Sequence, residues 1–267
     1  MKLSIITINY NNKDGLQKTI DSVISQTFKD FEWIVIDGGS TDGSRELIEK
    51  NENYFSFWCS EHDKGVYNAM NKGIVHAKGE YLNFMNSGDC FVSNHVLEKF
   101  FSNDNTNDIL YGNVVTFQTD KKYTLKTIHS DCIKGVDLIT SSICHQAAFI
   151  KLELFSKYGL YDESLELVSD WKFFFEVILI HKCSVKYLDI DVVVYDLNGI
   201  STKNKEHLLE ERHKVLRELL PDFVVEDYIR ELHRNEVFDN KMGRMAFSII
   251  YRLVLLYEKK KGYVLES

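Results

Sequence analysis

Residues 32–43 read EWIVIDGGSTDG, and this stretch decides the fold. The apolar run 33–36 is typical of a short strand that is buried on both faces. Asp37 closes the run, and the glycines and hydroxyl residues after it predict a sharp loop. Ser40 or Thr41 is then expected to cap the start of a helix. A buried strand that leads through a loop into a helix is the repeating unit of a parallel α/β sheet.

The same alternation extends over residues 1–90. Four such strands separated by helices predict a doubly wound, mostly parallel central sheet with a Rossmann-like nucleotide-binding half. Ligands collect beyond the carboxyl ends of the strands in such sheets, and a polar cluster follows each strand. These clusters therefore predict a binding site, although Asn, Asp, Ser and Gly are also ordinary turn residues. The other strands are expected at 3–8, 54–59 and 81–85, the helices at 16–28 and 66–74, and the clusters at 9–12, 37–42, 60–68 and 86–89.

The pattern is less regular after residue 107. From residue 201 onward the sequence is helical and charge-rich. We therefore expect an α/β domain over residues 1–200 and a helical C-terminal extension over residues 201–267. Within the first domain, strands are expected at 109–117 and 123–128 as a hairpin, at 147–150 and at 185–195, with a helix from Asp170 to about Ile180.

Composition excludes several classes of protein. The 267 residues carry a net charge of −8, which argues against a nucleic-acid partner. No apolar run approaches the roughly 20 residues of a membrane span. The five cysteines are widely spaced and form no CxxC pair, so free thiols are expected rather than a zinc site or disulfides. The first residues are too few and too β-branched for a signal peptide, so a cytoplasmic protein is expected.

Three features carry residues that suit chemistry. The loop after Asp37 matches neither GxGxxG nor GxxxxGK[ST], yet Gly39 lets a ligand approach the backbone and Asp37 can accept hydrogen bonds from a ribose or a base. The turn 86–89, NSGD, offers oxygen ligands for a divalent cation that bridges phosphates, or is an ordinary turn. Asp170 begins an apolar helix, as an N-cap or as a general base kept ionised by the helix dipole.

Together these motifs resemble the family 2 glycosyltransferases of the GT-A type, in the class that builds bacterial cell-surface polysaccharides. The resemblance covers almost all of residues 1–90 and fades beyond about residue 205. The matching stretches are SIITINYN (4–11), TIDSVISQTF (19–28), EWIVIDGGSTDG (32–43), SEHDKGVYNAMNKG (60–73) and AKGEYL (77–82), followed by His145-Gln146, Tyr161-Asp162, Ser169-Asp170-Trp171 and Gly199-Ile200-Ser201.

The resemblance implies a role for each matching position. Asp170 matches the catalytic base, and Asp89 is the carboxylate that would bind Mn²⁺ or Mg²⁺. Asn86 stands where the family has the first acid of its Asp-x-Asp motif, so metal affinity without nucleotide is expected to be weak. Nucleotide binding is implied for Thr7, Asn9, Asn11, Asp37, Gly39, Asp63, Lys64, Gly65 and Asn68, and contact with the donor sugar or diphosphate for Asn86, Ser87, Gly88, His145, Gln146 and Ser201.

The activity that the resemblance implies is inverting transfer of a sugar from a nucleotide sugar, UDP-linked by preference, to a hydroxyl of a glycan or polyprenyl-linked acceptor. Asp170 would take the proton of that hydroxyl, and no nucleophilic residue is required. Two alternatives stay open. A nucleotidyltransferase normally carries a basic glycine-rich loop where 9–13 reads NYNNK, and a non-catalytic sugar-nucleotide-binding protein has only Asn86 in its support.

The C-terminal segment 241–261 carries six basic residues and one acid. Most of its apolar positions between 242 and 257 form one helical stripe, and Phe247, Tyr251 and Leu255 lie off it. Such a helix suits contact with an anionic membrane surface, which would place the protein peripherally on the inner face of the cell membrane beside a lipid-linked acceptor. It equally suits packing on the catalytic domain or on the partner in a homodimer.

Overall fold

The computed structural model describes residues 1–102, 105–118, 121–125, 133, 135–195, 204–227 and 230. Ser201 and the basic segment 241–261 lie outside these residues, so the predictions made for them stay predictions. The chain divides into two compact units, Met1–Glu211 and a second one that begins at Arg212. The helix α9 (Lys205–Leu219) contains this division.

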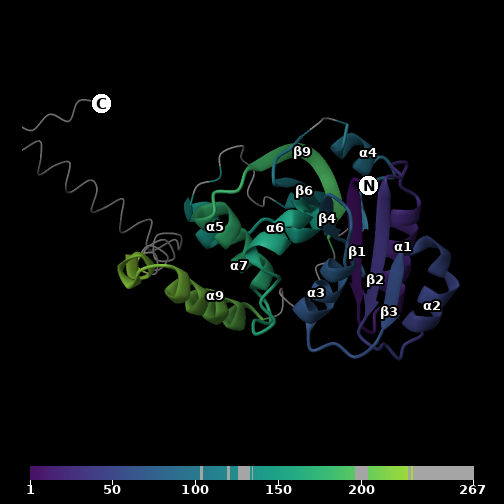
Figure 1. The fold of residues 1–267 in the computed structure, drawn as a ribbon, viewed down its shortest axis with the longest axis horizontal. Coiled ribbons are helices and arrows are strands. Elements are labelled where there is room, and N and C mark those ends of the chain that lie inside the picture. The colour runs from purple at the N-terminus through teal and green to yellow at the C-terminus, as the bar shows by residue number, and fades with distance from the viewer. Residues whose placement is uncertain are drawn as a thin grey trace, which may run out of the picture. The chain divides into compact units, whose positions relative to one another are not determined.

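In the described residues one nine-stranded sheet forms the centre of the first unit (Figure 1). Its strand order is β3-β2-β1-β4-β8-β6-β9-β5, and β7 pairs with β6. The strands are β1 (Leu3–Asn9), β2 (Phe31–Asp37), β3 (Phe57–Ser60), β4 (Tyr81–Phe84), β5 (Cys90–Phe91), β6 (Ile109–Gln118), β7 (Lys121–Leu125), β8 (Ala148–Lys151) and β9 (Val185–Val194).

Strands β3, β2, β1 and β4 are mutually parallel, as the sequence predicts for residues 1–90. Asn9 pairs with Asp37, and Asp37 pairs with Ser60, so three strands end at the same level. The other half of the sheet is mixed, because β8, β7 and β5 run antiparallel to their neighbours. The four parallel strands therefore bring their polar ends to one edge of the sheet.

The helices of the first unit are short, and several were not expected from the sequence. A helix of five to seven residues completes fewer than two turns, so its apolar spacing gives little periodic signal. The unexpected elements are α4, α5, α6 and the two-residue strand β5. The helices are α1 (Lys13–Ile24), α2 (Ser44–Lys50), α3 (Val66–His76), α4 (Val96–Phe100), α5 (Gly135–Thr140), α6 (Leu152–Tyr158) and α7 (Ser169–Phe175), with the single turns η1 (Glu52–Tyr54), η2 (His145–Ala147) and the π-helical η3 (Glu176–Ile180).

The start of α2 differs from the prediction. The helix begins at Ser44, and its N-cap is Gly43 with a φ of 91° rather than Ser40 or Thr41. The Ser40 hydroxyl is already used, since it donates to Asp37 and accepts from the backbone N–H of Asn11. The loop after β2 is therefore longer than expected, and the Ser40 hydroxyl bonds to residues at the strand ends instead of capping the helix.

Helices cover both faces of the parallel strands, with α1 and α2 on one side and α3 on the other (Figure 1). Leu16, Ile20 and Val23 of α1 are fully buried in one cluster with the strand residues Ile5 and Val35. On the other side α3 approaches β1 closely, since a β-carbon at Gly73 would clash with Ile6. This packing between two helical layers holds the strand ends in fixed positions.

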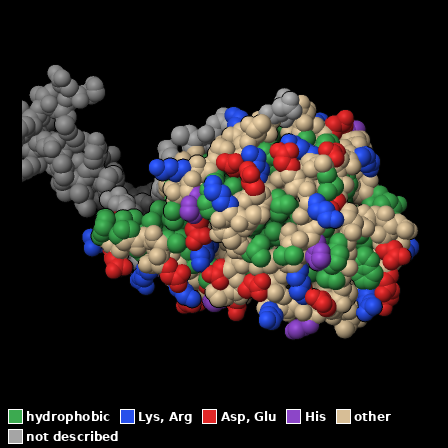
Figure 2. Space-filling model, in the orientation of Figure 1, with side chains coloured by type: hydrophobic (Ala, Val, Ile, Leu, Met, Phe, Trp, Pro, Cys, Tyr) green, Lys and Arg blue, Asp and Glu red, His purple; other side chains and the backbone are tan. Residues whose placement is uncertain are grey.

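Acidic and basic side chains are interspersed on the face shown in Figure 2. No helix among the described residues has the length and apolar character needed to cross a membrane.

Candidate active site

Asp37, at the end of β2, is fully buried and is the centre of a hydrogen-bond cluster. Its carboxylate accepts from Asn9 Nδ2 (2.7 Å), from the Ser40 hydroxyl and backbone N–H (2.6 and 2.9 Å), and from the Ser60 hydroxyl (2.6 Å). Burial acts to raise the pKa of Asp37, but these hydrogen bonds outweigh it and hold the pKa below 3.8. Asp37 is therefore ionised and ties the loop after β2 to the ends of β1 and β3.

Three other residues expected to bind nucleotide lie at different depths around this cluster. Gly39 is exposed with a φ of 81°, and Asn11 is exposed and accepts from the backbone N–H of Thr41 (2.9 Å). Thr7 is fully buried, and its hydroxyl accepts from the indole N–H of Trp33 (3.0 Å). Asn11 and Gly39 are thus open to a ligand, whereas Thr7 holds β1 against β2 from inside.

Asp63 faces the loop after β2 from the segment between β3 and α3. One of its oxygens pairs with Lys72 Nζ (2.7 Å). The other lies 3.1 Å from the position that a β-carbon on Gly38 would take, and the ring of Tyr10 lies 3.2 Å from the same position. Asp63, the backbone of Gly38 and Tyr10 therefore form one wall. Tyr10 was not assigned to the site from the sequence. Its side chain is 65% exposed. The sequence feature that could have indicated it is an aromatic residue directly after the buried strand β1.

The tip of the same segment is open. Lys64 and Gly65 are exposed, and no atom lies within 4 Å of the place of a β-carbon on Gly65. Asn68 ties the tip down, because its side chain accepts from the backbone N–H of Lys64 (3.2 Å) and donates to Glu163 (2.9 Å). The segment is thus anchored through Asn68, while Lys64 and Gly65 at its tip stay accessible.

The turn 86–89 follows β4 and is held by α1. Gly88 has a φ of 107°, a conformation that favours glycine. The Thr19 hydroxyl accepts from the Gly88 N–H (3.1 Å) and donates to the backbone carbonyl of Asp89 (2.8 Å), while Asn12 Nδ2 donates to the carbonyl of Ser87 (3.0 Å). Sequence reasoning gave Thr19 and Asn12 no role, although both lie in or beside the quoted motifs.

Two carboxylates far apart in the sequence are contacted by adjacent residues of η2. Asp89 is buried, and its Oδ2 accepts from Gln146 Nε2 (3.1 Å). Asp170, in the first turn of α7, has one oxygen 2.8 Å from His145 Nδ1 and accepts from the Tyr67 hydroxyl at the other (2.8 Å). The structure therefore places both carboxylates against one turn, at the carboxyl end of β4.

Asp170 is not an N-cap, because the cap position of α7 is Val168. Its side chain is 16% exposed. Burial acts to raise the pKa of Asp170, but the hydrogen bond and attraction of His145, with the hydrogen bond of Tyr67, hold that pKa below 3.8. Asp170 is thus an ionised carboxylate, as a general base must be.

Tyr67 was also missed from the sequence, where it directly follows Gly65 and Val66. It lies on α3 and is buried. Burial, and then the negative charge of Asp170, raise the pKa of Tyr67 well above 10. The phenol therefore stays protonated and donates its hydrogen bond to Asp170 throughout the working pH range.

A divalent metal is implied by the resemblance, and the residues present fit one that takes few protein ligands. Among the described residues no three His, Cys, Asp or Glu side chains are grouped to hold a metal ion. The turn does offer the Asp89 carboxylate together with Asn86 Oδ1, a buried oxygen that has no hydrogen-bond partner. Such oxygens suit Mg²⁺ or Mn²⁺, which complete their coordination with phosphate oxygens and water.

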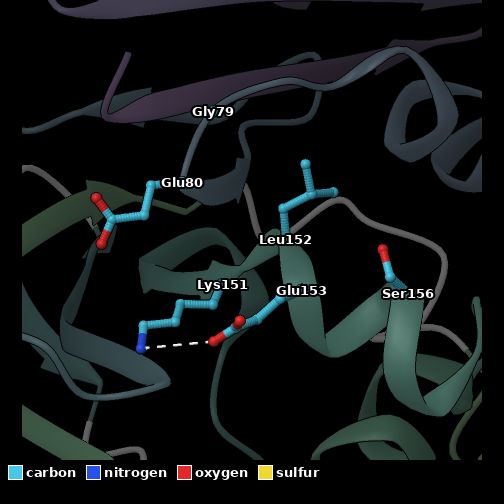
Figure 3. Close-up of a pocket in the computed structure, with 6 residues that line it drawn as sticks. All are labelled: Gly79, Glu80, Lys151, Leu152, Glu153 and Ser156. Carbon is cyan, nitrogen blue, oxygen red and sulfur yellow. Dashed lines mark ion pairs between the residues drawn. The ribbon is translucent and has the colours of Figure 1, made fainter.

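A separate hollow of about 520 Å³ lies at the opposite end of the sheet (Figure 3). Lys151 lies in the wall of this hollow and pairs with Glu153 (3.7 Å). Lys151 is at the end of β8 and lies opposite Tyr81, at the start of β4. The hollow contains none of the site residues expected from the sequence. It is lined by Gly79, Glu80, Lys151, Leu152, Glu153 and Ser156.

Comparison with known sequences identifies the family to which the chain is similar. The pattern of glycosyl transferase family 2 matches residues 4–159. An uncharacterised glycosyltransferase of Mycobacterium tuberculosis is 31% identical over 207 residues, which cover 75% of this chain and 77% of that protein. A PGL/p-HBAD biosynthesis glycosyltransferase of Mycobacterium bovis is 29% identical over 209 residues, which cover 74% and 78% of the two chains.

Solved structures share the fold. S. aureus TarS 1–349 in complex with UDP superposes with a TM-score of 0.67 at 18% identity, over 90% of this chain and 73% of that chain. The mannosyltransferase PcManGT from Pyrobaculum calidifontis, in complex with GDP-Man and Mn²⁺, gives 0.59 at 13% identity over 95% and 80%. The chain spans 44% of the length of the longer TarS structure. These likenesses show the expected GT-A fold, and with the sequence matches they establish that this chain belongs to glycosyl transferase family 2 and is a glycosyltransferase.

Proposed function

We propose that this glycosyltransferase moves a sugar, with inversion, from a UDP-linked donor to a hydroxyl of a glycan or polyprenyl-linked acceptor. The observation that carries the proposal is the ionised carboxylate of Asp170, held by Tyr67 and His145, against the turn that also contacts Asp89. The TarS structures with UDP and with UDP-GlcNAc support a UDP-linked donor. A relative named as a PGL/p-HBAD biosynthesis glycosyltransferase supports a biosynthetic role for the transfer.

The nucleotide is proposed to bind along the ends of β1, β2 and β3. Its base and ribose would lie between the loop after β2 and the wall formed by Asp63, Gly38 and Tyr10. Thr7 and Asp37, which are fully buried, would support this subsite from below. The direct contacts are assigned to Asn9, Asn11, Gly39, Asp63, Lys64, Gly65 and Asn68, and the diphosphate contacts to Asn86, Ser87 and Gly88. Ser201 is assigned to the donor sugar or diphosphate by the resemblance alone.

In the proposed reaction Asp170 accepts the proton of the acceptor hydroxyl while that oxygen bonds to C1 of the sugar. The C1–O bond to the diphosphate breaks in the same step, and its electron pair leaves with the nucleoside diphosphate. A Mn²⁺ or Mg²⁺ ion bound at Asp89 would neutralise charge on this leaving group. Attack from the face opposite the leaving group inverts the configuration at C1. Holding both substrates in line supplies a large share of the acceleration.

The proposal is tested by screening UDP-GlcNAc, UDP-glucose, UDP-galactose and GDP-mannose with Mn²⁺. A donor that raises the melting temperature and slowly releases its nucleoside diphosphate without acceptor supports a transferase. Release of pyrophosphate from UTP and a sugar 1-phosphate would instead identify a nucleotidyltransferase. A donor that binds but is not cleaved, with or without crude lipid and glycan acceptors, would identify a non-catalytic binding protein.

A further inference from the structure

Both ring nitrogens of His145 are occupied by protein groups. Nδ1 lies 2.8 Å from Asp170 Oδ2, and Nε2 lies 3.2 Å from the side-chain nitrogen of Asn86. A contact this short between Nδ1 and an ionised carboxylate requires a proton on Nδ1. The side-chain amide of Asn86 occupies Nε2. His145 therefore donates to Asp170, and neither nitrogen is left to bind a sugar hydroxyl.

Gln146, the next residue, is held in the same way towards the other carboxylate. Its Nε2 donates to Asp89 Oδ2 (3.1 Å), and its Oε1 accepts from the Cys144 thiol (2.9 Å). Burial, and then the negative charge of Asp89, raise the pKa of Cys144 to about 12, so the thiol keeps its proton and remains a donor. The Gln146 amide therefore has one orientation, with its nitrogen directed at Asp89.

The backbone that carries these two side chains is itself fixed. Asn83, fully buried on β4, donates from Nδ2 to the carbonyls of Gln146 and Ala148, both at 2.9 Å. The ring of Phe84 lies edge-on to His145, with the ring centroids 6.3 Å apart. The turn is thus tied to the strand that leads into Asp89, so it cannot shift independently of that strand.

We infer that residues 144–147 form a brace that positions the two carboxylates of the site relative to each other. His145 orients Asp170 towards the acceptor, and Gln146 orients Asp89, the carboxylate that would hold the cation. His145 and Gln146 are then positioning residues rather than contacts of the donor sugar. The inference rests on the proposed function. It adds to it how Asp170 and Asp89, which come from separate parts of the chain, are kept at a fixed separation.

The test for His145 is a matched pair of substitutions. In His145→Asn the amide nitrogen takes the approximate place of Nδ1, and in His145→Gln it takes the approximate place of Nε2. A brace predicts that His145→Asn keeps kcat within about tenfold of the unaltered enzyme, while His145→Gln lowers kcat by about 10²-fold, each with little change in the KM of the donor. The reverse order, with a raised donor KM in His145→Asn, would assign Nε2 to the sugar and overturn the inference. Equal activity of both variants would also overturn it.

Gln146→Met tests the other arm without removing the turn. Methionine fills a similar volume but donates no hydrogen bond to Asp89. We expect the affinity for Mn²⁺ in the presence of UDP, measured by electron paramagnetic resonance, to fall about tenfold, with Cys183→Ser, a cysteine outside the site, as the control. Unchanged Mn²⁺ affinity would contradict the brace.

The melting temperature and UDP affinity of each variant show whether it has folded. If His145→Gln does not fold, Tyr67→Phe takes its place in the test. Tyr67→Phe removes the other hydrogen bond to Asp170 and leaves the turn intact. A brace then predicts a smaller loss of kcat in Tyr67→Phe than in His145→Ala. An unaltered enzyme that transfers no sugar would refute the proposed function, and the Mn²⁺ affinities would still judge the brace.

Discussion

Asp170 is the residue whose removal should affect the chemical step alone. It contacts Tyr67 and His145, and neither contact belongs to the proposed nucleotide subsite at the ends of β1 to β3. Asp170→Asn keeps the shape of the side chain but removes its capacity to accept a proton. We expect kcat to fall by about 10²–10⁴-fold with little change in donor affinity. Steady-state kinetics and calorimetric titration of the donor measure the two quantities, and a comparable loss of donor affinity would contradict the assignment of the base.

The ionisation of Asp170 also predicts the pH dependence of the reaction. The titratable groups that face it are Tyr67, His145, Tyr161 and Cys144. Because these surroundings hold the pKa of Asp170 below 3.8, falling pH protonates this carboxylate, the proposed base, only under strongly acidic conditions. With saturating substrates kcat should therefore stay level from about pH 8 down to about pH 5. A decline centred between about pH 6 and 7 would assign the base to a different group.

At the scale of elements, the contact between α1 and the turn 86–89 decides where Asp89 lies. Thr19 is fully buried, and its hydroxyl joins the Gly88 N–H to the carbonyls of Asn86 and Asp89. Replacing it by valine keeps the volume but removes the acceptor of the Gly88 N–H and the donor to the Asp89 carbonyl, and the loss of a buried hydrogen-bond partner costs about 1–3 kcal/mol.

Thr19→Val should accordingly lower the free energy of unfolding by about 1–3 kcal/mol and weaken UDP binding in Mn²⁺. Urea unfolding and UDP titration measure these effects. Thr27→Val is the control, because Thr27 is exposed just after α1 and its hydroxyl contacts Asn94 and Glu98 rather than the turn, so its substitution should change stability by about 0.5 kcal/mol or less. Equal effects of the two substitutions would show that Thr19 has no special part in holding the turn.

At the scale of the whole molecule, the open question is how the enzyme reaches its acceptor. If the basic segment 241–261 lies on membranes, the protein should sediment with vesicles that contain anionic lipid and not with neutral ones. Deleting residues 241–267, or changing Lys259, Lys260 and Lys261 to Glu in the full chain, should release it. Each basic residue near an anionic surface contributes about 1 kcal/mol, so the triple substitution should abolish binding. An unaltered protein that stays in the supernatant would assign the segment to protein packing instead.

Most of the parallel half of the sheet could be predicted from the sequence, and the reason is local. Buried strands such as 33–36 and amphipathic helices such as α1 and α3 leave periodic apolar patterns, and the strand ends are marked by polar residues. The strand expected at 147–150 is present as β8, but the two-residue strand β5 and the short helices α4, α5 and α6 carry too few residues for such a pattern. The antiparallel direction of β8 and β5 follows from long-range pairing, which local periodicity does not encode.

By itself the sequence determined the family and the parallel strand ends, and it predicted the roles of Asp89 and Asp170, because motif order and hydrophobic spacing are properties of the chain. The tertiary structure alone decided the partners of those carboxylates. Tyr67 and His145 meet at Asp170 from separate elements, and Thr19 contacts the turn 86–89 from α1, the first helix of the chain. Hydrogen bonds across such sequence separations depend on how sheet and helices pack, so only the folded chain shows which side chain holds which.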